Sequence, residues 1–371
     1  MGKSKLNSDH LFHIPVMGTA FTIDTPLKVA RFGVSSVVSL CDDELCEEMR
    51  QHYSDLYQKE YQPISVKDHD FRAKRITAYL NFLDDCINDQ IAQMKQQEFG
   101  QQQDLDKYFE LLPETSKTKL IYFTMLKTTD ATQKATLQDQ LKALIKPGSI
   151  DVNIMTKLDK DVFDKDRQPI AQHSDALAAL RGYALSQLDS SIVFSAGFNR
   201  RLYAYIDQFK DFFPDETGYI KKRIVLKVTD YRSSLTQGKF LAKKGIWVSE
   251  YRVESGLNCG GHAFASDGYL MGPILEEFKQ HKADLITTLL VICNGVLAKL
   301  NKPVFTTLPA VDITVQGGIG THNENQFLLD FYQIKRTGWA TPFLLVPEVT
   351  TLDDQTRMTL SKSTKDDLYL S

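Results

Sequence analysis

The 371-residue chain lacks the cysteine pattern of a protein held together by disulfides or by a structural metal. Its five cysteines form no Cys-x-x-Cys pair and follow no regular spacing. An odd, scattered count argues against a disulfide framework, so the expected compartment is the cytoplasm. No metal site is expected either, because His10 and His13 lie in a terminal segment and His322 lacks ligand partners at suitable spacing apart from Glu324.

The chain also lacks an excess of charge of either sign and a long uninterrupted apolar run. The formal net charge is −3, which gives no reason to expect a nucleic-acid partner. Met1 is followed by the polar stretch Gly2–Lys5, which does not have the pattern of a secretory signal. The longest apolar stretch, Leu285–Leu300, is interrupted by polar residues and is expected to be too short to span a bilayer. We therefore expect a globular protein without a membrane partner.

What the chain does have is a long alternation of strand-like and helix-like segments. Short apolar runs followed by amphipathic segments are typical of a parallel sheet covered by helices. Eight strand-like runs begin at Ile14, Ser35, Ile150, Ser191, Arg223, Ile246, Asp312 and Trp339. The first is expected to cover Ile14–Gly18 and the last Trp339–Leu345. Eight such strands predict a (β/α)₈ barrel of the α/β class, with a doubly wound open sheet as the alternative.

Residues 66–147 interrupt this alternation between the second and third strands. They are rich in Gln and Lys, and aliphatic residues recur at helical spacing, as in Ile76, Leu80, Leu83 and Ile87. This pattern predicts a helical insertion, which is also a candidate interaction surface. Residues 1–65 then begin the barrel, 148–350 complete it, and 351–371 form a tail. The tail stops inside a strand-like pattern, which fits either a piece of a longer protein or a frayed natural end.

Small or polar residues and glycines lie near the ends of strand after strand, at the rim where a barrel carries its active site. One stretch, Glu254–His262, ends a strand with two glycines and a histidine, whose side chain titrates near neutral pH. We predict His262 as the proton-transfer group, with an ordinary loop histidine as the alternative. The candidate ligand-binding residues on this rim are Gly18, Thr19, Asn153, Ser195, Lys227, Gly260, Gly261, Gly317, Gly318, Gly320 and Thr341.

The segment Gln316–Thr321 reads Gln-Gly-Gly-Ile-Gly-Thr and precedes a helix. Barrels build phosphate sites from the loops after their last two strands, because glycines let the backbone approach and a helix N-terminus supplies unpaired N–H donors. This stretch therefore predicts a phosphate site, with a plain tight turn as the alternative. Lys227, near the end of another strand, either stabilises negative charge on a bound ligand or pairs with Glu250 or Glu254.

Taken in order, these motifs resemble the nitronate monooxygenase (2-nitropropane dioxygenase) family. The related trans-acting enoyl reductases of polyunsaturated fatty acid synthases are similar, because they also pair Gly-Gly-His with a later Gly-Gly-Ile-Gly-Thr. The segments that carry the resemblance are Met17–Ala20, Val152–Ile154, Gly260–His262, Gly317–Ile319 and Ala340–Leu344. The resemblance implies an FMN-binding barrel, an oxidoreductase that acts on a small-molecule substrate with O₂ or NAD(P)H as a further reactant.

The resemblance also implies roles for single residues. It makes His262 the catalytic base, or the residue that faces the substrate over the flavin. The chain departs from the family at Ala340, where glycine is usual, at Asn258–Cys259, and in its helical insertion. The substrate is therefore open, and so are a flavin-free lyase or isomerase acting on a phosphorylated metabolite and a binding module that uses the insertion. The residues implied to surround FMN are Gly18, Thr19, Asn153, Lys227, Gly261 and, at its phosphate, Gly317, Gly318 and Thr341.

Overall fold

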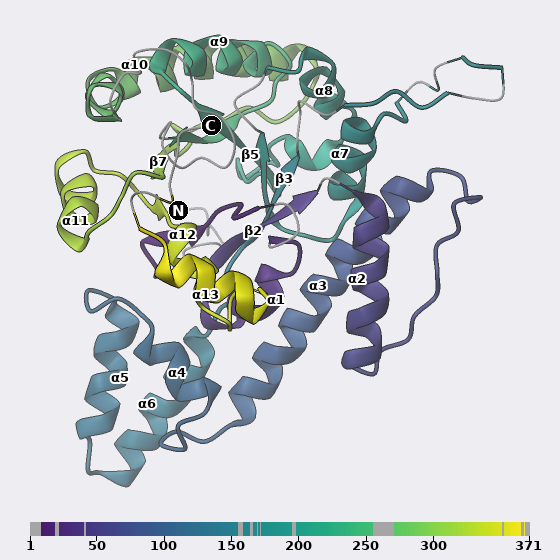
Figure 1. The fold of residues 1–371 in the computed structure, drawn as a ribbon. Helices are drawn as coiled ribbons and strands as arrows, with labels where there is room; N and C mark the ends of the chain where they lie inside the picture. Colours follow the sequence, from purple (N-terminus) through teal and green to yellow (C-terminus); the bar gives the residue numbers. More distant parts are fainter. Residues whose placement is uncertain are drawn as a thin grey trace.

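Short runs rich in β-branched residues form the strands of a closed parallel barrel, as a computed structural model shows (Figure 1). The structure describes residues 9–18, 22–40, 42–154, 159–163, 166–168, 170, 172–194, 198–254, 271–350, 352–364 and 367, and only the backbone of residue 341. The strands follow one another around the barrel in chain order, and the last pairs with the first. They are β1 (Phe12–Ile14), β2 (Ser35–Leu40), β3 (Ile150–Ile154), β4 (Ser190–Phe194), β5 (Lys222–Val228), β6 (Val248–Glu254), β7 (Asp312–Gln316) and β8 (Thr337–Gly338). The predicted (β/α)₈ barrel is confirmed.

Helices lie between successive strands and cover the outside of the barrel (Figure 1). The connection between β2 and β3 carries several helices where a simple barrel has one. The helices are α1 (Thr25–Val29), α2 (Asp43–Leu56), α3 (Phe71–Gln96), α4 (Asp104–Glu110), α5 (Lys117–Lys127), α6 (Ala131–Leu144), α7 (Asp175–Leu185), α8 (Arg200–Tyr205), α9 (Tyr231–Ala242), α10 (Met271–Lys299), α11 (His322–Phe331), α12 (Thr341–Leu344) and α13 (Asp354–Lys362). Short 3₁₀ turns, η2 (Ala30–Phe32), η3 (Ile206–Gln208) and η4 (Lys210–Phe212), complete the connections.

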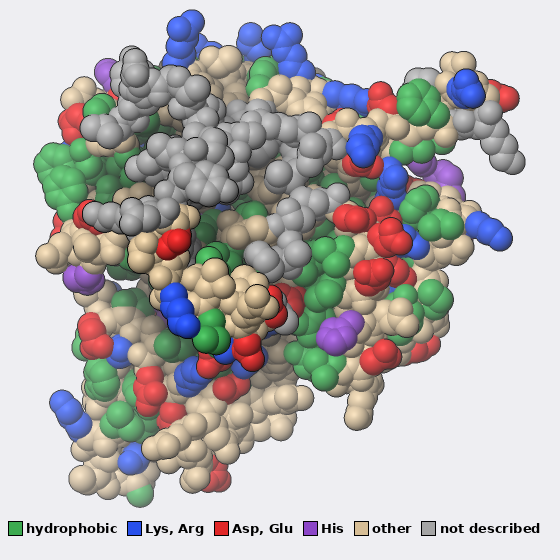
Figure 2. Space-filling view, in the orientation of Figure 1, with side chains coloured by type: hydrophobic (Ala, Val, Ile, Leu, Met, Phe, Trp, Pro, Cys, Tyr) green, Lys and Arg blue, Asp and Glu red, His purple; other side chains and the backbone are tan. Residues whose placement is uncertain are grey.

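The helical insertion between the second and third strands is confirmed, and it has a hydrophobic core of its own. The distal part of α3 packs with α4, α5 and α6 around buried side chains that include Met94, Phe109, Tyr122 and Leu141. Figure 2 shows charged side chains of both signs scattered over its surface, at the lower left of the view. The proximal part of α3 instead packs on α7 in the helical layer of the barrel. Gly182 permits this close approach, because a Cβ there would lie 2.7 Å from the Cβ of Ile76.

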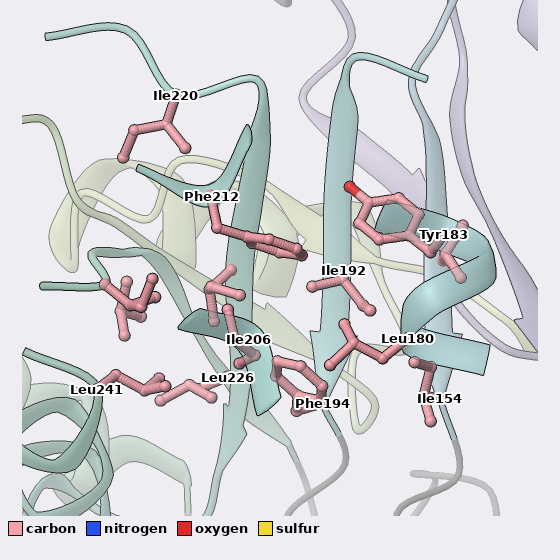
Figure 3. Close-up of a cluster of buried hydrophobic side chains, with 14 of the residues drawn as sticks. Ile154, Leu180, Tyr183, Ile192, Phe194, Ile206, Phe212, Ile220, Leu226 and Leu241 are labelled. Carbon is pink, nitrogen blue, oxygen red and sulfur yellow. The ribbon is translucent and has the colours of Figure 1, made fainter. Parts of the chain in front are cut away.

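The main hydrophobic core lies between the barrel wall and its covering helices. On β4, Ile192 and Phe194 point outward, and side chains of α7, such as Leu180, meet them (Figure 3). Leu226 on β5 and Leu241 on α9 continue the same layer (Figure 3). Full burial of each such side chain contributes roughly 1.5 to 3 kcal/mol, so this layer is a large favourable term for the barrel.

The inside of the barrel is polar, in contrast to the branched aliphatic residues that usually fill such barrels. Side chains alternate along a strand, so the residues between the outward-facing apolar ones point inward. On β6 the buried outward residues are Tyr251 and Val253, which leaves Glu250, Arg252 and Glu254 facing the interior. The other polar residues that alternation turns inward include His13, Ser35, Ser39, Asp151, Asn153, Ser191, Lys227, Thr314 and Gln316.

Three predicted elements need correction. The first strand is Phe12–Ile14, not Ile14–Gly18, because Pro15 has no N–H to donate to a neighbouring strand. The predicted last strand, Trp339–Leu345, is wrong: β8 is Thr337–Gly338, and Thr341–Leu344 is helical, with proline in its first turn. A short apolar run does not distinguish a strand from a helix by its pattern alone.

The third correction concerns α10, which begins at Met271 and not near Leu285. Its 29 residues are long and apolar enough to cross a membrane by length and composition, so the expectation that this stretch is too short is wrong. One such helix is weak evidence of a membrane span, because helices that cover a protein core pass the same test. Here α10 packs against α9 and β6 through Leu285, Leu289 and Cys293.

Candidate functional site

Three polar side chains meet at the carboxyl ends of neighbouring strands. Lys227 on β5 places its Nζ 3.1 Å from Oε1 of Glu254 on β6, and both side chains are nearly buried, with exposed fractions of 12% and 6%. Gln316, the register partner of Glu254 on β7, donates from Nε2 to the same oxygen at 2.6 Å. Of the two roles that the sequence leaves open for Lys227, the pairing with Glu254 is therefore present. The three residues form one polar group at the mouth of the barrel.

A second polar group lies deeper in the barrel and is centred on Glu250. Its carboxylate accepts hydrogen bonds from Arg252 Nε at 2.8 Å, Thr314 Oγ1 at 2.5 Å and Arg336 Nη2 at 2.9 Å. Burial opposes the ionisation of Glu250, but the two guanidinium groups outweigh it and lower its pKa to about 2. Glu250 is therefore ionised at any ordinary pH, and it neutralises one of the two arginines.

His13 on β1 is a buried site residue that the sequence alone did not bring forward. It is fully buried, and neither ring nitrogen makes a well-aligned hydrogen bond to a described residue. Burial, together with Arg252 and Arg336, lowers the pKa of His13 well below its usual value, so the imidazole is neutral at pH 7. Gly338 keeps room beside it, because a Cβ there would lie 2.9 Å from His13 Nε2. The wrong start of the first strand hid the fact that His13 faces the interior.

The glycine stretch after β7 divides into a turn and a helix cap. Gly317 and Gly318 both adopt left-handed backbone angles, with φ of 79° and 69°, which only glycine takes without cost. Gly320 instead donates its N–H to Oε2 of Glu324 at 2.9 Å, and the N–H of Thr321 reaches the same oxygen at 2.9 Å. These bonds cap α11 with its own carboxylate. A phosphate at Gly320 would have to displace Glu324, whereas one at the Gly317–Gly318 turn would not.

The remaining predicted residues fall into two groups. Gly18 follows β1, and its carbonyl accepts a 2.6 Å hydrogen bond from Thr22. Asn153 lies on β3, faces the interior and is the register partner of Ser39. Since parallel strands end on one rim, the structure brings Gly18, Asn153, Lys227 and the Gly317–Gly318 turn to the same end of the barrel. The predicted residues outside the described part of the chain are Thr19, Ser195, Gly260, Gly261, His262 and, for its side chain, Thr341.

Neither a metal centre nor a reactive thiol is found within the ranges that the structure describes. No group of three or more His, Cys, Asp or Glu side chains there could hold a metal ion. The described cysteines, Cys46, Cys86 and Cys293, are buried and form no disulfide bond with one another. Burial raises the pKa of Cys86 to about 11 and that of Cys293 to about 12, so neither is a thiolate at neutral pH. No protein-family model matches the chain and no curated protein is significantly similar to it, so family membership stays a prediction from the motifs.

Proposed function

We propose that this chain is an FMN-dependent oxidoreductase of the nitronate monooxygenase-like class. The observation that supports the proposal best is the arrangement of the rim. A lysine within a buried polar group, Lys227 with Glu254 and Gln316, shares one end of a closed parallel barrel with the left-handed Gly317–Gly318 turn. In barrels of this kind the carboxyl ends of the strands carry the active site. A flavin mononucleotide needs a cation near its ring and a close backbone approach at its phosphate.

The rim residues fit FMN at the ring and at part of the phosphate site. Lys227 is held by one carboxylate oxygen, so a ring that gains negative charge would share its ammonium group with Glu254. Asn153 would face the ring from β3, and the Gly317–Gly318 turn would hold the phosphate. Glu324 repels a phosphate at the start of α11, so the cradle we propose excludes Gly320.

The flavin would accept and pass on electrons, while residues of the chain would bind it and move the proton. His262 is the proposed acid or base on the substrate, as the Gly-Gly-His motif predicts, and it lies outside the described residues. A nitronate monooxygenase and an enoyl thioester reductase both need a flavin that transfers electrons and a side chain that transfers a proton. A flavin-free lyase or isomerase remains the alternative that keeps the barrel and the phosphate site.

The purified protein provides the first test. We expect a yellow protein with absorbance between about 350 and 500 nm, or a colourless one that binds added FMN. Lys227→Gln should weaken FMN binding about tenfold, because it removes one charge-assisted contact. Lys221→Gln changes a partly exposed lysine just before the start of the same strand, at the opposite end from the rim, and should leave FMN binding unchanged. A colourless protein that fails to bind FMN would overturn the proposal.

The two flavin reactions separate in a second assay. Oxygen consumption with an alkyl nitronate indicates the monooxygenase, and NAD(P)H oxidation that depends on an enoyl thioester indicates the reductase. His262→Ala should abolish either activity and leave FMN bound. A variant that retains full activity would remove His262 from the proposed chemistry.

A further inference from the structure

A cavity of about 290 Å³ lies outside the barrel wall, where the N-terminal ends of α2, α3 and α7 meet. Leu40 of β2 and Ile154 of β3 line it. Their strand neighbours Ser39 and Asn153 point the other way, into the barrel, because side chains alternate along a strand. The sheet itself therefore separates this cavity from the polar mouth of the barrel. It is a second concave site, distinct from the candidate flavin site.

The floor of the cavity is apolar. Leu40 and Ile154 form it from the strands and Ile76 from α3, and all three are buried. On the α7 side the lining residues are alanines, among them Ala176 and Ala179, whose short side chains leave the volume open. One water takes about 30 Å³ in the liquid, so the cavity holds roughly ten non-hydrogen atoms. That is the size of one small metabolite.

The rim of the cavity carries charges of both signs, and Figure 2 shows acidic and basic side chains close together in this region. Asp42 caps α2 by accepting from the Glu44 N–H at 2.8 Å, and it is exposed to solvent. Arg72 contacts Asp175 through Nη1 at 2.5 Å and Asp43 through Nε at 3.5 Å.

Lys160, also on the rim, is exposed. The rim therefore has three carboxylates and two cations. A ligand with a single charge would meet like charges somewhere on this rim, whereas a ligand with both charges and an apolar part would match rim and floor together.

We propose that this cavity binds a small zwitterion with an aliphatic side chain, of the chemical class of free leucine or isoleucine. Its ammonium group would face Asp42 and Asp175, its carboxylate would face Arg72 and Lys160, and its side chain would rest on the apolar floor. The ligand would connect α2, α3 and α7, and so join the helical insertion to the barrel. Binding to the folded state alone raises the unfolding temperature, so the site would couple the ligand to stability. The proposal does not depend on the flavin.

The test titrates the full chain with L-leucine by calorimetry and follows thermal unfolding at the same concentrations. We expect saturable binding below about 10 mM, which is a weak but specific affinity. N-acetylleucine lacks the ammonium group, leucinamide lacks the carboxylate and glycine lacks the side chain. Each should bind at least about tenfold more weakly, since each loses one group that the cavity recognises. No saturable binding of leucine, or equal binding of any of the three, would overturn the proposal.

Two substitutions sharpen the test without disturbing the fold. Asp42→Asn keeps a good helix cap but removes the charge, so it should weaken leucine binding about tenfold. Asp130→Asn makes the same change at the cap of α6, where the side chain accepts from Gln133 N–H, and should have no effect. Lys160→Ala should also weaken leucine binding, because it removes a cation that would face the carboxylate of the ligand. Unchanged affinity in both Asp42→Asn and Lys160→Ala would rule out the proposed contacts.

Discussion

Lys222 is a fully buried amine at the amino end of β5, and its replacement by methionine should stabilise the protein at neutral pH. Its Nζ donates to the carbonyl oxygen and to Oγ of Ser186, both at 2.9 Å, and lies 4.4 Å from the centroid of the Tyr183 ring. Burial, helped by the charge of Lys221, lowers the pKa of Lys222 from 10.5 to about 7. The folded state therefore disfavours the protonated form of Lys222, whereas the unfolded chain does not.

The size of the effect follows from this pKa. A difference of about 3.5 between the unfolded and folded pKa values corresponds to about 5 kcal/mol. Because the folded-state pKa of this base is lowered, the unfolded chain binds more protons between pH 7 and 10.5. The destabilisation is therefore complete below about pH 7 and fades as the pH rises through this window. Lys222→Met removes this destabilisation but leaves the Ser186 carbonyl without its hydrogen-bond donor, which costs about 1 to 3 kcal/mol. The net gain in the free energy of unfolding near pH 7 is therefore about 2 to 4 kcal/mol.

Urea unfolding of wild type and Lys222→Met across the range from about pH 7 to 9.5 measures this effect. The free energy of unfolding of the wild type should rise by about 1.4 kcal/mol per pH unit relative to the variant, because all other titrating groups are shared. Lys221→Met should keep the wild-type slope but start the rise at a somewhat higher pH, because it removes a neighbouring charge that lowers the pKa of Lys222. If the curves of wild type and Lys222→Met run parallel, Lys222 does not titrate in this window and the reasoning fails.

Two further substitutions probe packing and the interior charges. Glu250→Gln leaves the buried Arg252 and the partly buried Arg336 without their carboxylate, so we expect a loss of about 3 to 5 kcal/mol in the free energy of unfolding by urea; a loss below about 1 kcal/mol would show that the interior charges are not coupled. Gly182→Ala forces a Cβ within 2.7 Å of Ile76 and should cost about 1 to 3 kcal/mol. The matched change Gly295→Ala, in α10, adds a Cβ that meets none of the neighbouring described residues within 4 Å and should stabilise by up to about 1 kcal/mol; similar effects at both glycines would refute the close contact between α3 and α7.

The barrel could be predicted because each strand carries its own local signal. β2 and β7 begin at the predicted residues, Ser35 and Asp312, and a short apolar run flanked by turn residues is enough to place them. The order of the strands was enough to predict that residues at the strand ends share one rim, since parallel strands end on the same side of a barrel. The insertion was visible because aliphatic residues at helical spacing, such as Ile76 and Leu83, continue over many turns.

What the sequence missed depends on contacts between distant segments. The sequence indicated Glu250 and Glu254 as possible partners of Lys227 but left the choice open, because that choice depends on the register of the strands, and it did not predict that Gln316 joins the pair. The cluster around Glu250 recruits Arg336, which is 86 residues away in the chain. The prediction of the last strand was wrong for a local reason. The apolar run that contains Pro342 folds as a helical turn, and β8 has only two residues.

The short first and last strands leave three neighbouring junctions of the barrel, β1–β2, β7–β8 and the closing β1–β8, with two register pairs each. β1 and β8 share only two register pairs, and two flanking backbone bonds, from Thr337 N to Leu11 O and from Trp339 N to His13 O, both at 3.1 Å, hold the junction. Neighbouring strands such as β5 and β6 are joined over five pairs. Proteins open first where few bonds must break together, so solvent should enter the barrel earliest beside β1 or β8. Opening between β1 and β8 breaks the contact that closes the barrel and leaves the pairing of the other strands in place. The ring of strands would then uncurl as an open sheet, with its edges at the two ends of the chain.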